Sequence, residues 1–112
     1  MIQAEEKSGR QNRRLAVSLA VVLSTGEAHY FIETENLSEK GLCLRPKKNF
    51  PVGAQYRMAF GHPPWLPRIG AVGTVRWSIT DKGVGVEFSS ISANDEQVLQ
   101  QFLNSLSGPW QV

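Results

Sequence analysis

The chain has 112 residues, of which 41% are hydrophobic and 20% charged, with one cysteine and a formal net charge of +2. A chain of this length forms one domain around one core and has little interior for a large cofactor. Its longest apolar-rich stretch, 15–23, is far shorter than the ~20 residues of a membrane helix, so no membrane insertion is expected. The small basic excess does not by itself indicate nucleic-acid binding.

The first 14 residues are polar, lack hydrophobic periodicity after Ile2 and are interrupted by Gly9. We expect residues 1–14 to form a flexible N-terminal arm and residues 15–112 to form the folded domain. The arm lacks the apolar region and cleavage site of a secretory signal, so a cytoplasmic location is expected. Four of the twelve basic residues lie in this arm: Lys7, Arg10, Arg13 and Arg14.

Hydrophobic patterning predicts six consecutive strands after the arm. Apolar residues alternate through 15–23, 56–60, 69–77 and 84–88, while 29–34 and 42–44 are rich in aromatic, β-branched or aliphatic residues. In the fifth strand this alternation places Trp77 on the same face as Val75. Turn residues separate the strands at 24–27, at the three-proline segment 61–67 and at 81–83. Because the connections are short, we expect antiparallel neighbours and a mainly β fold, either a sandwich or a small barrel.

The C-terminal segment is predicted to be a helix over about 93–106. Ser92 followed by Asp95 resembles a capping box, and Gly108 and Pro109 mark the far end. We expect this helix to pack against the barrel or over one of its open ends. Its apolar residues fall on one stripe: Val98, Leu99, Phe102, Leu103 and Leu106.

The residues needed for catalysis are scarce. Cys43 is the only cysteine, and His29 and His62 are the only histidines. They show neither a nucleophile with an adjacent base nor the ligand spacing of a metal site, and no glycine-rich phosphate loop joins a strand to a helix. We therefore expect no enzymatic activity, no catalytic residue, no metal and no cofactor. We expect Cys43 to be a partly buried structural thiol, and a lone cysteine agrees with a reducing compartment.

The arginines at the end of the arm are the first candidate binding residues. Arg10 and Arg14 are four positions apart, so they lie on roughly the same side of an extended or a helical segment. Their guanidinium groups can donate two hydrogen bonds to a phosphate or to guanine, and can stack on bases. Arg13 faces away from Arg14 in an extended arm and is a weaker candidate. A solvated basic tail is the alternative interpretation of this segment.

The second candidate lies between the predicted second and third strands. Asn36 and Ser38 are two positions apart, so in extended backbone an amide and a hydroxyl project to the same face. Gly41 permits a positive φ where the chain turns back. These are also ordinary turn residues that cap local backbone groups, which is the structural alternative. Trp77 is either a core or barrel-rim residue or an aromatic ring beside a ligand.

Together, Arg10-x-x-x-Arg14 before the first strand and Asn36-x-Ser38-x-x-Gly41 at the second turn resemble the two-part signature of the PilZ domain, a family of bacterial cyclic di-GMP receptors. Segments 73–77 and 83–88 look like the family's later strands, and the resemblance covers roughly residues 10–106. It implies a six-stranded antiparallel β-barrel with a C-terminal helix and a ligand on its outer surface. Many members have Asp where this chain has Asn36, whose amide keeps an acceptor but loses the charge. The implied ligand-binding residues are Arg10, Arg14, Asn36, Ser38 and Gly41, with Arg13 and Trp77 as further candidates.

The resemblance also implies a function without catalysis: a cyclic di-GMP receptor whose arm becomes ordered on binding and changes the surface offered to a downstream protein. Two alternatives remain open. One is a PilZ-like adaptor that binds another protein without nucleotide, through a surface formed by Pro63, Pro64, Trp65 and Leu66. The other is a small barrel that uses its basic arm on RNA or DNA, which the lack of a dense basic face disfavours.

Overall fold

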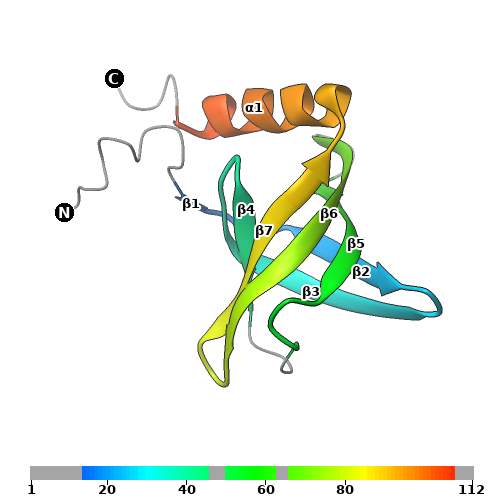
Figure 1. Cartoon of the computed structure of the whole chain (residues 1–112). Helices are drawn as coiled ribbons and strands as arrows, with labels where there is room; N and C mark the ends of the chain where they lie inside the picture. The colour runs from blue at the N-terminus through cyan, green and yellow to red at the C-terminus, as the bar shows by residue number, and fades with distance from the viewer. Residues whose placement is uncertain (1–13, 46–49, 63–65, 108–112) are drawn as a thin grey trace.

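A computed structural model describes residues 14–45, 50–62 and 66–107 of the chain. Within these ranges the chain forms seven strands followed by one helix, in the order that Figure 1 shows. The predicted mainly β fold with a C-terminal helix is therefore confirmed. The elements are β1 (Leu15–Ala16), β2 (Ala20–Thr25), β3 (Ala28–Leu37), β4 (Gly41–Leu44), β5 (Gln55–His62), β6 (Leu66–Ile79), β7 (Gly83–Ile91) and α1 (Ala93–Ser107).

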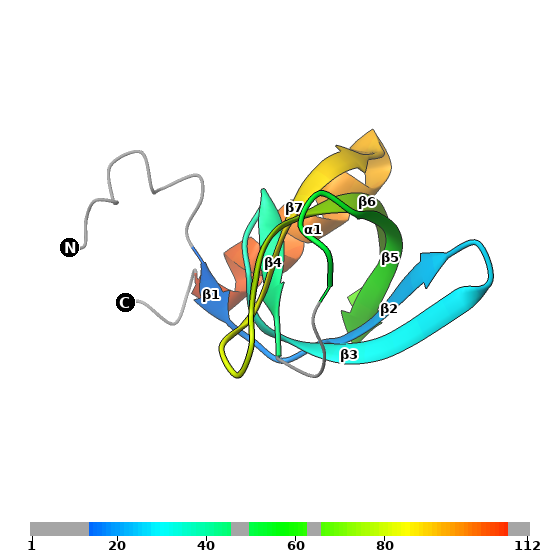
Figure 2. The same ribbon diagram turned by 60° about the horizontal axis from the view of Figure 1, so that its bottom comes forward.

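The strands form one antiparallel sheet that closes on itself. Their order is β1-β3-β2-β5-β6-β7-β4, and an additional pairing between β3 and β4 completes a ring of six strands. Figure 2 shows these strands curving around a common axis, with the β2–β3 hairpin extending away from β4. Closure removes most free sheet edges, which is how a small antiparallel sheet avoids pairing with other chains.

The first predicted strand, 15–23, is divided in the structure. β1 and β2 both pair with β3, but residues 17–19 leave the ladder between them. Thr34 is fully buried, and its hydroxyl bridges this break. Thr34 Oγ1 donates a hydrogen bond to the Val17 carbonyl at 2.6 Å and accepts one from the Leu19 amide at 2.9 Å. The hydroxyl therefore replaces ladder bonds that the interrupted strand has lost.

The core lies inside the barrel and is built from alternate strand positions, as the period-two pattern predicts. At one end Phe60 stacks on Phe88 with ring centroids 5.8 Å apart. At another point Tyr30, Phe50 and Tyr56 meet edge to face, with centroids 5.4 to 6.4 Å apart. The largest fully buried side chains are Phe60, Leu23, Leu37, Leu42, Leu44, Ile69 and Leu99.

The proline-containing loop predicted over 61–67 is shorter than expected. β5 continues to His62 and β6 begins at Leu66, and these two residues form the last backbone pair after an irregularity beyond Phe60. Neither paired residue is a proline, so the ladder can continue up to the loop. Residues 63–65, which include part of the surface considered for a protein adaptor, lie outside the described residues.

The helix α1 lies across one end of the barrel, as expected (Figure 1). Leu99 is fully buried, and Val98, Phe102 and Leu103 pack against the core. The predicted cap is present, because the Asp95 amide donates to Ser92 Oγ at 3.1 Å and the Ser92 hydroxyl bonds the Asp95 carboxylate. In the part of the chain that the structure describes, no helix is long and apolar enough to cross a membrane.

Candidate functional site

A row of paired residues crosses the outer surface of four strands. Asn36 on β3 pairs with Cys43 on β4, Cys43 with Gly85 on β7, and Gly85 with Trp77 on β6. Paired residues in an antiparallel sheet point to the same side. The neighbouring residues of β4, Leu42 and Leu44, are fully buried in the core, so this row faces outward. A groove of about 450 Å³ lies on this face and is lined from β6, β7, the turn before β4 and the residue before β1.

Arg14 is the residue just before β1, and its side chain reaches this surface. Its guanidinium Nη1 donates a 2.7 Å hydrogen bond to Asn36 Oδ1. β1 sets this contact, because Ala16 is paired with Asn36 across the ladder. Two residues that the sequence patterns select separately, 22 positions apart, are therefore joined at one edge of the groove.

The predicted turn at 38–41 contributes the next part of the groove. Ser38 follows β3 directly, lines the groove, and is almost completely buried. Its hydroxyl donates to the Gly41 carbonyl at 3.3 Å and accepts a bond from the Lys40 amide at 3.3 Å, while its own amide donates to the Gly41 carbonyl at 2.8 Å. Ser38 therefore both closes the turn and lines the groove.

The expected reason for glycine at position 41 is wrong. Gly41 is not among the residues with positive φ in the described chain. Instead, a Cβ at this position would lie 2.1 Å from the carbonyl oxygen of Val86 on β7. Glycine is needed because the backbones of β4 and β7 approach closely here, at the point where the barrel surface carries the groove.

Trp77 does not share a face with Val75, as the simple alternation predicts. A register irregularity between Val75 and Trp77 turns the indole outward, and 39% of Trp77 is exposed while Val75 is buried. The indole lies over Gly85, where an added Cβ would be 2.1 Å from Nε1. Trp77 is thus a groove-lining ring rather than a core residue.

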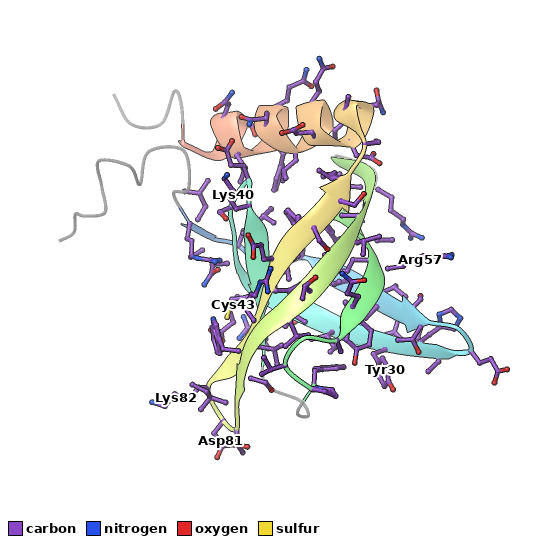
Figure 3. The ribbon with its side chains drawn as sticks, in the orientation of Figure 1. Tyr30, Lys40, Cys43, Arg57, Asp81 and Lys82 are labelled. Atoms are coloured by element: carbon purple, nitrogen blue, oxygen red, sulfur yellow. The ribbon has the colours of Figure 1, made fainter. Side chains whose placement is uncertain are left out.

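Three charged groove residues were missed by the sequence analysis: Lys40, Arg76 and Glu87. Lys40 lies in the turn that leads into β4, below α1 in Figure 3. Arg76 Nε donates to Glu87 Oε1 at 2.6 Å across β6 and β7. Glu87 alternates with buried Val86 and Arg76 with buried Val75, so both had a detectable outward position, whereas Trp77 faces outward only because of the irregularity in β6.

The groove is electropositive. Its described lining includes the cations of Arg14, Lys40 and Arg76 and the single carboxylate of Glu87. The Arg14 charge also acts on Cys43. Burial raises the pKa of the Cys43 thiol and nearby Glu35 raises it further, while Arg14 opposes the shift. As expected, Cys43 is a buried thiol. Among the described residues, no group of histidine, cysteine and carboxylate side chains is arranged to hold a metal.

Two predicted binding residues cannot be placed in this geometry, because Arg10 and Arg13 lie outside the described residues. The structure brings the others together on one surface. Arg14, Ser38 and Trp77 line the groove, Asn36 holds Arg14 at its edge, and Gly41 lets β4 approach β7 beside it.

Solved structures with the same fold support this architecture. MotI/DgrA, the inhibitor of motility of Bacillus subtilis, is 23% identical with a TM-score of 0.73, over 88% of this chain and 52% of that one. MrkH, described as a c-di-GMP-dependent transcription regulatory factor, is 11% identical with a TM-score of 0.70, over 85% of this chain and 49% of that one. The chain thus spans about half the length of these two proteins.

A third structure matches almost end to end. The PilZ domain of CeSA, from a cellulose-synthesizing bacterium, has a TM-score of 0.62 and 12% identity, over 85% of this chain and 98% of that domain. No curated protein matches the chain in sequence. The family model of the PilZ domain matches residues 8–105, which include both sequence patterns, all seven strands and nearly all of the helix. The chain therefore belongs to the PilZ domain family.

Proposed function

We propose that this protein is a non-enzymatic receptor that binds cyclic di-GMP in the outer groove. The observation that carries the proposal is the set of charges around the groove. Arg14, Lys40 and Arg76 with Glu87 give the described lining a net charge of +2, beside the exposed face of Trp77. Cyclic di-GMP carries two phosphates and two guanines, so it needs both cations and flat surfaces for stacking. The groove volume of about 450 Å³ lies within the range of small-molecule sites.

Each groove residue has a role in this proposal. Asn36 holds Arg14 through Nη1, and a guanidinium has five N–H donors, so donors remain on Arg14 for a phosphate. Lys40 supplies a second cation from the turn that Ser38 closes. Trp77 offers an aromatic face for one guanine. Arg10, and with a smaller role Arg13, would add cations from the chain segment before Arg14.

The proposed signal follows from where Arg14 lies. It is the last residue of the arm, so ligand contacts to Arg10 and Arg14 would order the arm over the groove. Ordering the arm costs conformational free energy, and the free energy gained from charged contacts to the ligand must be larger than this cost. The ordered arm would present a changed surface to a downstream protein. MotI/DgrA is described as an inhibitor of motility and MrkH as a transcription regulatory factor, so proteins with this fold are described with different outputs.

The test is calorimetric titration of the whole chain with cyclic di-GMP at fixed salt, comparing wild type with Arg14→Ala. We expect the variant to lose about 1.5–3 kcal/mol of binding free energy, which is roughly ten- to more than a hundredfold in affinity. Arg57→Ala is the matched control. Arg57 is an exposed arginine on β5 that lies away from Lys40 and Cys43 in Figure 3 and does not line the groove. Its loss should leave affinity within about threefold.

Two other outcomes identify the alternatives. If cyclic di-GMP gives no heat while a generic oligonucleotide binds with a steep salt dependence, the protein is a nucleic-acid binder. If neither ligand binds, the nucleotide-independent adaptor is favoured. If wild type binds but Arg14→Ala binds equally well, the ligand does not use the groove described above.

A further inference from the structure

Glu87 is the one carboxylate on the described lining of the groove. It projects from the outer face of β7, because its neighbour Val86 is buried in the core. About half of its side chain is exposed, and its Oε1 accepts a 2.6 Å bond from Arg76 Nε. A carboxylate in a site for a dianion opposes binding by charge alone. Its presence therefore suggests a specific contact with a neutral, hydrogen-bond-donating part of the ligand.

The other candidate acceptor for such a contact is already engaged. The Oδ1 oxygen of Asn36 accepts a charge-assisted bond from Arg14 at 2.7 Å. Asn36 thus orients the arginine and carries no formal charge of its own. Glu87 has two carboxylate oxygens with about four acceptor positions, of which the Arg76 contact uses one.

We propose that Glu87 binds the Watson–Crick edge of guanine and makes the groove selective for guanine over adenine cyclic dinucleotides. Guanine presents two adjacent donors on this edge, N1–H and the 2-amino group, which match the two oxygens of a carboxylate. Adenine presents one amino donor beside the N1 acceptor, so a carboxylate would face a lone pair. This inference rests on the proposed function, because it concerns the same groove and the same ligand class.

The surroundings of Glu87 fit a base-binding position. Glu87 is two residues along β7 from Gly85, so both face outward about 7 Å apart. Trp77 lies over Gly85, and its indole lines the same groove as the carboxylate. Arg76 holds Glu87 in position and offsets its charge through Nε. Its terminal nitrogens carry four further donors that can serve a phosphate or the guanine oxygen.

The experiment measures the ratio of affinities for cyclic di-GMP and cyclic di-AMP by calorimetry on the whole chain. A ratio is used because removing a negative charge strengthens binding of any dianion. In Glu87→Gln the amide matches adenine, with its oxygen accepting from the amino group and its nitrogen donating to N1. We expect the ratio to fall by more than about tenfold, with tighter cyclic di-AMP binding. Glu87→Asp keeps the carboxylate and should retain a preference for guanine.

Two controls separate recognition from charge and from local structure. Glu27→Gln removes the same charge from the turn of the β2–β3 hairpin, which extends away from β4 in Figures 1 and 2, and should leave the ratio unchanged. Arg76→Gln breaks the ion pair but keeps the carboxylate, so it should weaken both dinucleotides and preserve the guanine preference.

The results separate a failure of the role of Glu87 from a failure of the proposed receptor function. If wild type binds neither dinucleotide, both the function and this inference are wrong. If wild type binds cyclic di-GMP but Glu87→Gln keeps the ratio within about threefold, the receptor function stands and the role of Glu87 is overturned. The role is also overturned if Arg76→Gln changes the ratio as much as Glu87→Gln, because the ion pair rather than the carboxylate would then set the preference.

Discussion

The hydroxyl of Thr34 is predicted to hold the strand break that places Arg14 at the groove. It is buried and bonds both sides of the break, the Val17 carbonyl at 2.6 Å and the Leu19 amide at 2.9 Å. Thr34→Val keeps the side-chain shape and removes both bonds, so no cavity contributes to the effect. The change in the free energy of unfolding therefore reports the loss of the hydroxyl and of its two hydrogen bonds, without a contribution from a cavity.

The magnitude follows from the exposure of those groups. Leu19 is 2% exposed, so its orphaned amide should cost about 1–3 kcal/mol. Val17 is only partly buried, so water can reach its carbonyl and the added cost should be about 0.5–1 kcal/mol. We expect Thr34→Val to lose about 1.5–4 kcal/mol, a large part of the 5–15 kcal/mol typical of a domain.

Urea unfolding followed by circular dichroism measures this loss as a shift of the midpoint at constant slope. Thr34→Ser restores the hydroxyl and removes one methyl group, so it should lose only about 1 kcal/mol. Thr25→Val is the matched control on a half-buried strand residue and should change stability by less than about 0.5 kcal/mol. A loss below about 0.5 kcal/mol in Thr34→Val, or an equal loss in Thr34→Ser, would refute the assigned role.

Two further predictions concern Gly41 and the pH dependence of stability. Gly41→Ala brings a Cβ to 2.1 Å from the carbonyl oxygen of Val86, which is a backbone atom and cannot rotate away. Thermal unfolding should therefore show a loss of at least about 2 kcal/mol in the free energy of unfolding. An unchanged melting temperature would show that the strands separate without strain. Burial raises the pKa values of Cys43 and Tyr56, so the unfolded chain should ionise first as pH rises and stability should fall from about pH 8.5 upward. Cys43→Ala should flatten the first part of that decline in urea unfolding at a series of pH values, and identical slopes in both proteins would contradict the shift at Cys43.

Much of the fold was predictable because its local signals agree with one another. Alternating apolar residues of β5, such as Tyr56, Met58 and Phe60, point into the barrel core, as the period-two pattern requires. Ser92 caps α1, and the stripe through Leu99 packs on the barrel. These features depend on neighbours in sequence, so the sequence alone predicts them.

The candidate site was predictable only in part. Arg14, Asn36 and Ser38 belong to short patterns, and the contact between Arg14 and Asn36 confirms that these patterns meet. Lys40 lies inside one pattern but was not recognised, because its position in the groove depends on how the turn enters β4. Arg76 and Glu87 come from strands that share no pattern with the others, so only their pairing across β6 and β7 brings them to the groove.

The sequence by itself determined the type and order of the main elements, the buried faces of most strands and the small set of polar residues that belong together. The tertiary structure decided three things that depend on contacts between distant segments. The first predicted strand is broken where the Thr34 hydroxyl bonds its backbone, the close approach of β4 and β7 requires Gly41, and an irregularity in β6 turns Trp77 outward. Alternation specifies a face only while the ladder is regular, and ladder irregularities are set by the partner strand.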